Sequence, residues 1–469
     1  MPQPTSPSDP ASARNDPGAA ANLPWRARDL AHVWHPCTQM QDHEALVPMI
    51  PIRGGSGVWL TDFAGQRYLD AISSWWVNLF GHANPRINAA LRAQLDSLEH
   101  VILAGFTHEP VIRLSEALTG LAPTGLTRCF YADNGSAAVE VALKMSFHYW
   151  RNVGHSAKRR FVTLSGSYHG ETLGALAVGN VDLYKEVYKP LLMEVITVPS
   201  PDAFDREAGL SEAQWAQHQF AKMEAVLAAQ AHEIAAVIVE PLVQCAAGMR
   251  MYDPLYLKLL RAACDRYHVH LIADEIAVGF GRTGTLFACE QAGIRPDFMC
   301  LSKGLTGGYL PLSAVLTGEE IYAAFYDEYT NLTAFLHSHS YTGNALACAA
   351  ALATLEIFRT EPVLERNRTL AQHFARATAP LSDHPHVAEV RQRGMITAIE
   401  MVRDKQPRVP YPWQERRGLT VYRHALARGV LLRPIGNVIY FMPPYIIEPE
   451  HIDLMVEVAR EGLELATCA

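Results

Sequence analysis

Short apolar runs alternate with longer segments of helical apolar spacing between residues 128 and 318. Two of the runs, at residues 268–274 and 298–303, stop at polar residues, and the segment between them is long enough for a crossover helix. Strands that alternate with helices in this way are typical of a parallel sheet covered on both faces. The pattern therefore predicts a large, doubly wound α/β domain.

The two ends of the chain follow other patterns. Residues 1–22 are rich in Pro, Ser, Asp, Ala and Gly, which predicts a disordered tail. Residues 23–80 include a predicted hairpin and are expected to form the N-terminal segment of a smaller domain, whereas residues 81–355 form the large domain. Helices with interspersed strands over residues 356–469 predict an α+β portion that packs with the N-terminal segment.

Asp274 and Lys303 stand at the ends of two predicted neighbouring strands. Ligands of parallel sheets bind outside the carboxyl ends of the strands, so we expect both side chains at one site. A partly desolvated lysine is a candidate for Schiff-base chemistry, and the aspartate could keep a pyridine nitrogen protonated, as pyridoxal 5'-phosphate (PLP) requires. A surface lysine and a loop aspartate would produce the same pair, so the pair alone leaves both interpretations open.

Other strand ends also carry polar and aromatic residues. A strand-like run at residues 128–133 leads into Asn134, Gly135 and Ser136, which open a strongly amphipathic helix. Free N–H groups and the positive end of the helix dipole favour phosphate there, although an ordinary helix cap has the same sequence. A further strand ends near Tyr168, as expected beside a cofactor ring.

Adjacent aromatic residues at positions 75 and 76 face different directions in either a strand or a helix. One tryptophan can therefore serve the core while the other lines a cavity. Two tryptophans buried in the core or at an interface would fit this dipeptide equally well.

Composition narrows the range of functions. The formal net charge of −8 argues against a general binder of nucleic acid or anionic membranes, since both need a basic face. No apolar run approaches bilayer length, and the N-terminus lacks a signal-peptide pattern. The eight cysteines are scattered without a CxxC spacing, which indicates reduced thiols in a cytoplasmic protein. His337 and His339 have no third ligand at a fitting spacing, so no metal site is predicted.

Six tracts, in this order, resemble the motifs of the class III aminotransferases, PLP-dependent enzymes of fold type I: NGSAAVEVALK, SYHGET, EP at residues 240–241, DEIAVGFGRTG, LSKGLTGG and SYTGNALACAA. The matching pieces run from about residue 34 to residue 445. The resemblance implies a large doubly wound domain with a mixed or parallel sheet, and a smaller α+β domain built from both termini. It also implies PLP as the cofactor.

The cofactor-binding residues implied by the resemblance are Gly135, Ser136, Tyr168, Asp274, Ile276, Lys303, His339 and Ser340. Lys303 is expected to hold PLP covalently and to move the proton, and Asp274 to pair with the pyridine nitrogen. Tyr168, which we count with these two as catalytic, and Ile276 would cover the two faces of the ring. Ser340 would reach the phosphate in the neighbouring subunit, which implies a homodimer with shared active sites.

The substrate-binding residues implied are Cys37, Trp75, Trp76, Tyr168, Lys303, Ser338, Arg433 and Tyr440. Within the family, WHPCTQM, SSWWVNLFGH and LRPIGNVIYFMPPY resemble the branch that serves biotin synthesis, where S-adenosyl-L-methionine donates an amino group to 8-amino-7-oxononanoate. Arg433 would clamp the carboxylate of the keto acid bidentately. The two tryptophans would pack along the apolar chain of this substrate. Tyr440 would favour S-adenosyl-L-methionine over other amino donors.

Two positions depart from relatives in this branch. Cys37 stands where they commonly have Tyr, so a stacking face worth on the order of 1 kcal/mol is lost. Glu171 stands where some have Asp, which keeps the charge and adds a methylene.

Two other functions share parts of the pattern. An ω-amino acid:pyruvate or diamine aminotransferase of the same family would have the same cofactor motifs, but the double tryptophan and the tract around residues 432–445 argue against it. A non-catalytic PLP-binding regulator would need an attached DNA-binding module, for which the first 30 residues are too short and too polar.

Overall fold

A seven-stranded sheet forms the centre of the larger part of the molecule. The computed structural model describes residues 17–47 and 49–468. In spatial order, the strands of this sheet are β4 (Arg128–Ala132), β12 (Ser313–Thr317), β11 (Phe298–Leu301), β10 (His270–Asp274), β7 (Ile234–Val239), β5 (Arg160–Leu164) and β6 (Val195–Val198). β12 runs antiparallel to both of its neighbours, β4 and β11, and the other strand pairs in this sheet are parallel. The predicted parallel pairing of the strands that precede Asp274 and Lys303 is confirmed, with Asp274 opposite Cys300.

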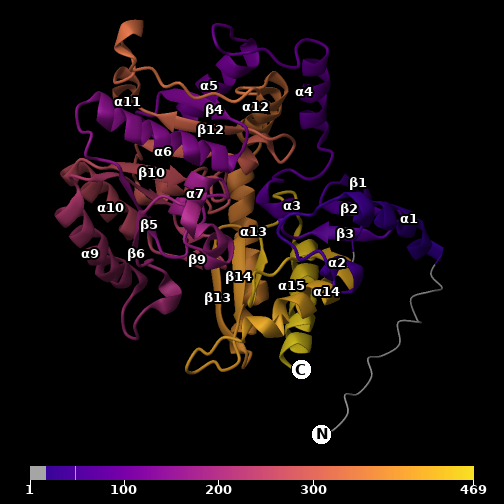
Figure 1. The fold of residues 1–469 in the computed structure, drawn as a ribbon. Helices are drawn as coiled ribbons and strands as arrows, with labels where there is room; N and C mark the ends of the chain where they lie inside the picture. Colours follow the sequence, from indigo (N-terminus) through magenta and orange to yellow (C-terminus); the bar gives the residue numbers. More distant parts are fainter. Residues whose placement is uncertain (1–16, 48, 469) are drawn as a thin grey trace.

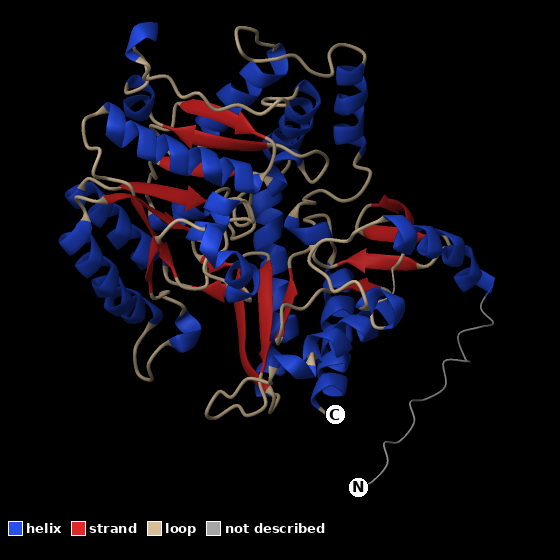
Figure 2. Ribbon diagram, in the orientation of Figure 1, coloured by secondary structure: helices blue, strands red, loops and turns tan. Residues whose placement is uncertain are grey.

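Helices cover both faces of this sheet (Figures 1 and 2). Along β11, Phe298 and Cys300 pack in one apolar cluster with α6 (Gly135–Asn152), whereas Met299 and Leu301 pack in the other. The second cluster contains α9 (Glu212–Gln230), α10 (Pro254–Tyr267) and α12 (Ala345–Thr360). Because successive strand residues face opposite sides, a fully apolar strand buries both of its faces here. This confirms the predicted doubly wound α/β architecture.

A second part of the molecule combines segments from both ends of the chain (Figure 1). Its four-stranded sheet contains β1 (Ile52–Ser56), β2 (Trp59–Asp62), β3 (Arg67–Asp70) and β15 (Val430–Leu431). The predicted hairpin is the antiparallel pair β2 and β3, and β15 lies parallel to β3. This pairing joins the N-terminal and C-terminal segments, while the domain boundaries near residues 80 and 355 stay predictions.

The rest of the C-terminal segment forms a three-stranded antiparallel sheet with helices beside it. The strands are β13 (Val387–Arg393), β14 (Ile396–Met401) and β16 (Val438–Phe441). The helices are α13 (Val363–Thr378), α14 (Arg417–Ala427) and α15 (Pro449–Thr467).

The remaining helices and short strands connect these parts. They are α1 (Pro17–His32), α2 (Asp42–Ala45), α3 (Ser73–Trp76), α4 (Pro85–Leu95), α5 (Glu109–Leu121), α7 (Leu173–Val178), α8 (Asp182–Lys185), α11 (Glu319–Ala323), β8 (Val243–Gln244) and β9 (Arg250–Met251).

The predicted disordered tail needs a correction at its C-terminal end. Residues 1–16 lie outside the described residues, but residues 17–22 begin α1. Asn22 Nδ2 donates to Asp62 Oδ2 at 2.8 Å, and Trp25 stacks on Phe63 with ring centroids 4.7 Å apart. Because alanines favour helix and these contacts anchor it, the segment is helical despite its polar composition.

Candidate active site

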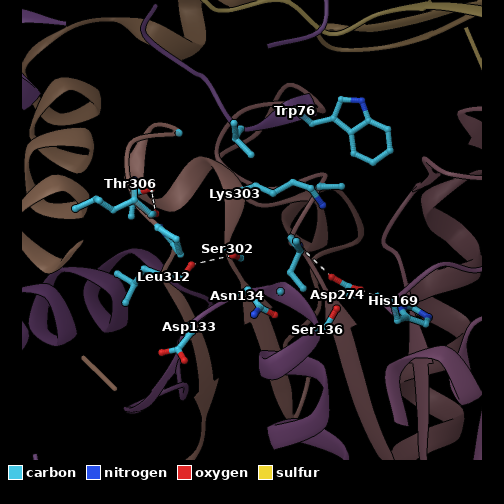
Figure 3. A pocket seen from close by; sticks show the side chains of 18 of the residues that line it. Trp76, Asp133, Asn134, Ser136, His169, Asp274, Ser302, Lys303, Thr306 and Leu312 are labelled. Atoms are coloured by element: carbon cyan, nitrogen blue, oxygen red, sulfur yellow. Dashed lines mark hydrogen bonds and ion pairs between the residues drawn. The ribbon is translucent and has the colours of Figure 1, made fainter. Parts of the chain in front are cut away.

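Asp274 and Lys303 meet at a cavity of about 490 Å³ outside the carboxyl ends of β10 and β11. Figure 3 shows Lys303 extending between Trp76 on one side and Asp274 on the other. Lys303 Nζ has no hydrogen-bond partner within the described residues, and lies 5.2 Å from the centroid of the Trp76 ring. Burial lowers the pKa of Lys303, and the charges of Asp274 and Glu240 oppose this shift. A larger fraction of Lys303 is therefore in the neutral amine form than for a free lysine at the same pH.

The carboxylate of Asp274 is fixed by two short contacts. It is 4% exposed, its Oδ2 lies 2.7 Å from His169 Nδ1, and its Oδ1 accepts from Ile276 N at 3.1 Å. The side chain of His169 is fully buried, so it orients this carboxylate. The sequence places His169 beside Tyr168 at a strand end expected near a cofactor ring, but it does not indicate this contact with Asp274.

A second buried carboxylate borders the same cavity. Glu240, directly after β7, accepts from Tyr168 N at 2.9 Å and Cys245 N at 3.0 Å. Burial, reinforced by the charge of Asp274, raises the pKa of Glu240 to about 8. Sequence reasoning gave Glu240 no role, but its position at the end of a buried strand was the available signal.

The N-terminus of α6 forms another wall of the cavity. Asn134 caps the helix by accepting from Ala137 N at 3.0 Å, so the first-turn N–H groups of Gly135 and Ser136 have no helical partner. Gly170, with φ +122°, lets its chain approach so closely that a Cβ would lie 2.0 Å from Ser136 Oγ. These groups make a concave donor surface suited to an anion.

The double tryptophan occupies α3, whose residues have positive φ values. Trp76 is 5% exposed and lines the cavity, and its Nε1 donates to Tyr440 Oη at 3.0 Å. Tyr440 is 1% exposed and lies behind Trp76, outside the cavity lining. Trp75 is 39% exposed and lines an adjoining cavity of about 330 Å³. The structure thus separates the two rings, one to each cavity.

Arg433 lines the second cavity together with Trp75. Its guanidinium carbon lies 4.9 Å from the centroid of the Trp75 ring, and its Nη2 donates to Cys37 O at 3.2 Å. The Cys37 thiol lies 3.8 Å from Glu171 Oε1, which also accepts from Tyr168 Oη at 2.9 Å. Burial, together with the charge of Glu171, raises the pKa of the Cys37 thiol. Cys37 therefore keeps its proton and is a weak donor to Glu171, and it lines neither cavity.

Of the other predicted residues, Ile276 lines the first cavity, whereas Ser338, His339 and Ser340 line neither one. Ser338 and Ser340 are exposed. His339 Nδ1 lies 3.0 Å from Asp133 Oδ2, which places this segment beside the helix that opens at Gly135. Their predicted contacts with the cofactor and substrate stay predictions.

Three further features limit what this site and this molecule can do. In the part of the chain that the structure describes, no group of three or more His, Cys, Asp and Glu side chains is placed to hold a metal ion. No helix across residues 17–47 and 49–468 is long and apolar enough to span a membrane. All eight cysteines are free thiols.

Comparison with known proteins places this geometry in a family. The profile "Aminotransferase class-III" matches residues 40–462. The chain is 49% identical over 431 residues to adenosylmethionine-8-amino-7-oxononanoate aminotransferase of Helicobacter pylori, covering 91% of this chain and 94% of that protein.

Solved structures agree. The Methanocaldococcus jannaschii protein of the same name superposes with a TM-score of 0.89 at 37% identity, over 95% of this chain and 99% of that one. An omega transaminase of Pseudomonas jessenii in complex with PMP gives 0.90 at 29% identity, over 94% and 98%. With a buried lysine between an aromatic ring and a fixed carboxylate, and matches across nearly its whole length, the chain belongs to the class III aminotransferases, PLP-dependent enzymes of fold type I.

Proposed function

We propose that this enzyme transfers the amino group of S-adenosyl-L-methionine to 8-amino-7-oxononanoate, giving 7,8-diaminononanoate for biotin biosynthesis. The observation that carries the proposal is the arginine on the Trp75 face, beside the cavity that holds Lys303. A guanidinium and aromatic walls suit both an anionic nine-carbon chain and a sulfonium nucleoside. Proteins up to 49% identical carry the name of this activity.

The residues of the first cavity fit PLP. Gly135 and Ser136 would hold its phosphate, because both line the cavity and their first-turn N–H groups have no partner within the described helix. Asp274 would pair with the pyridine nitrogen, and Lys303, which has no competing hydrogen bond within the described residues, would hold the aldehyde carbon. Ile276 lies under Gly135, with its Cγ2 3.1 Å from the place of a Cβ there. Bound PLP supplies the electron sink for removal of a proton from the amino carbon.

Lys303 is the group that moves this proton. Because burial lowers its pKa, its amine can take up a proton and give it back at physiological pH more readily than an exposed lysine. Contacts with His169 and with Ile276 N hold both oxygens of Asp274 and so fix the orientation of its carboxylate. Two hydrogen bonds hold Tyr168 in position: its backbone N donates to Glu240, and its hydroxyl donates to Glu171.

Arg433 binds the substrate carboxylate, and Trp75 and Trp76 line the path between this carboxylate and Lys303. The departure at Cys37 removes an aromatic face beside Arg433, whose Nη2 donates to Cys37 O. Tyr184 lies close by, with its ring centroid 5.5 Å from that of Tyr168, and burial raises its pKa while the charge of Arg433 opposes this shift. Tyr184 thus supplies aromatic surface near the position of the missing ring.

We also propose that the enzyme acts in the cytoplasm as a homodimer in which Ser340 reaches the neighbouring site. Two adjacent segments support this. His100 Nε2 lies 2.8 Å from Ser340 O, and Asn344 Nδ2 donates to Glu99 O at 3.0 Å, which joins the loop before α5 to the loop before α12. These two loops expose large apolar side chains: Ile102, Phe106, Leu336 and Tyr341. An apolar surface of this kind is typical of a protein interface.

Absorbance of the bound cofactor tests the reaction in two halves. Addition of S-adenosyl-L-methionine alone should bleach the long-wavelength PLP band, and 8-amino-7-oxononanoate should then restore it. Alanine or putrescine acting far better than S-adenosyl-L-methionine would instead assign the enzyme to the ω-amino acid:pyruvate or diamine aminotransferases.

A further inference from the structure

The turn that carries the double tryptophan has a backbone that its residues rarely adopt. The φ values of Ser73, Ser74, Trp75 and Trp76 are 52°, 46°, 74° and 73°. This left-handed region is unfavourable for residues with a Cβ, and successive residues seldom occupy it. The turn closes through Trp76 N, which donates to Ile72 O at 2.8 Å. Since no glycine relieves the strain, contacts from outside the turn must stabilise it.

A buried carboxylate supplies these contacts. Asp70, the last residue of β3, is 0% exposed. It accepts from Ser74 N at 2.9 Å and from Ser74 Oγ at 2.7 Å, and its Oδ2 lies 3.0 Å from His82 Nε2. Asn78 Nδ2 lies 3.2 Å from His82 Nδ1, which directs the Nε2–H of this ring toward Asp70. Charge-assisted bonds to one carboxylate thus converge on the strained turn.

We propose that Asp70 is a positioning residue for the reaction, which acts by holding the turn that sets Trp75 and Trp76. The carboxylate lines neither cavity, so it has no direct contact with a ligand there. Its effect reaches the site through the two rings, one 5.2 Å from Lys303 Nζ and the other 4.9 Å from the guanidinium of Arg433. Without Asp70 the turn relaxes toward ordinary φ values, and both rings leave these positions.

The Asp70→Asn variant tests this role, with Asp62→Asn as a matched control. Asp62 is 2% exposed in the same small sheet and accepts from Gln66 N at 2.8 Å and Tyr68 Oη at 3.3 Å, without a bond to the turn. We expect Asp70→Asn to raise KM for 8-amino-7-oxononanoate about tenfold while kcat changes less than about threefold. Asp62→Asn should lower the melting temperature without changing KM. Equal KM values for the two variants would overturn the proposal.

A double-mutant cycle separates this role from a general loss of stability. If Asp70 acts through the tryptophans, Asp70→Asn should add less than about twofold to KM in a Trp75→Ala background. Fully additive effects would contradict the proposal. Ser74→Ala, which removes one bond at an exposed residue and keeps the buried charge, should raise KM in the same direction by a smaller factor. An unchanged KM for Ser74→Ala would also count against it.

A measurement without substrate distinguishes this proposal from the proposed function, on which its KM test depends. In the ligand-free protein, Asp70→Asn should lose the same tryptophan component of the near-ultraviolet circular dichroism spectrum that Trp76→Phe loses. A wild-type spectrum would overturn the positioning role. If the wild-type enzyme failed to use 8-amino-7-oxononanoate, the proposed function would be wrong. The spectrum would still show whether Asp70 holds the tryptophan turn, because it is measured without substrate.

Discussion

Opposing influences act on the amine of Lys303. Burial favours its neutral form, whereas the charges of Asp274, Cys245 and Glu240 favour its ammonium form, and burial is the larger effect. The backbone of Lys303 has φ 45°, so the residue is also held in a strained conformation. Its reactivity is therefore set by its surroundings and can be changed by substituting a neighbour.

The pH dependence of PLP uptake tests this balance. Only the neutral amine attacks the aldehyde, so the rate of uptake by cofactor-free enzyme should rise with pH through the Lys303 pKa, below the value of about 10.4 for a free lysine. The Asp274→Asn substitution removes a charge that favours the ammonium form, so the inflection should move to lower pH. Stopped-flow absorbance measures it. An inflection that stays in place, or moves to higher pH, would contradict the proposed effect of the Asp274 charge on the Lys303 pKa. Asp62→Asn, which removes a carboxylate away from this cavity, is the control and should leave the inflection unchanged.

The second prediction at the residue scale concerns Arg433. Replacing Arg433 by Ala should raise KM for 8-amino-7-oxononanoate about 100-fold, because a charge-assisted bidentate contact is lost. Arg433→Lys should recover only part of this loss, since an ammonium group cannot form the bidentate pair. Steady-state kinetics measure both variants. A simple alkyl amine without a carboxylate is the control substrate, and a comparable loss with this amine would mean that Arg433 acts on the fold of the cavity instead.

At the scale of elements, the sequence predicts strands and helices with a clear hydrophobic period. It does not predict the start of α1 or the left-handed turn at α3. The runs that end at Asp274 and near Lys303 are short, apolar and bounded by polar residues, so their strand character and pairing were readable. The start of α1 could not be predicted from local sequence, because it depends on the contact of Asn22 with Asp62, which lies 40 residues away along the chain. The left-handed turn at α3 opposes the intrinsic preference of Ser and Trp, so no local pattern could indicate it.

In the candidate site, too, some features follow from local sequence and others depend on the tertiary fold. Asp274, Lys303, Gly135 and Ser136 end strands or open helices, so local sequence located them. By contrast, the orienting bond from His169 to Asp274 depends on the order of strands in the sheet. Sequence proximity carries no signal for such a bond.

The loop before α12 contains an element that should respond to pH. Lys144 Nζ lies 2.8 Å from His337 Nδ1, so His337 Nε2 carries a proton toward His339 Nε2 at 3.0 Å, and His339 Nδ1 contacts Asp133 at 3.0 Å. This chain requires a neutral His337 ring, because its Nδ1 accepts from Lys144. Burial, with the charges of Lys144 and His339, lowers the pKa of His337, while Glu140 opposes this.

Because the folded pKa of His337 lies below its unfolded value of about 6.5, the unfolded state binds more protons as the solution is acidified. The contribution of His337 to stability is present above that value and is lost as pH falls through the folded pKa. Going from about pH 8 to about pH 5, the melting temperature of the wild type should fall on the order of 1 °C further than that of His337→Gln, whose amide keeps both bonds without titrating. Calorimetry measures both. Parallel curves for the two proteins would refute the assignment.

At the scale of the whole molecule, the described chain brings together most of the predicted cofactor-binding residues, but several predicted residues, among them Ser340, line neither cavity. Ser340 is exposed and lines neither cavity, although the loop that carries it lies next to other exposed apolar residues. This arrangement is consistent with a residue that serves a second copy of the chain. It also makes the assignment testable by mixing two damaged subunits.

Lys303→Ala subunits should be inactive, and Ser340→Asp subunits should be impaired because a carboxylate would repel the cofactor phosphate. If Ser340 acts in the neighbouring site, a mixed dimer has one site with both Lys303 and an intact Ser340. Denaturing and refolding an equal mixture should then recover about a quarter of wild-type activity, since half of the dimers are mixed and each has one working site. Mixing Lys303→Ala with Asp274→Ala should recover none, because both residues belong to the same subunit's cavity. No recovery in either mixture would place the action of Ser340 within its own subunit.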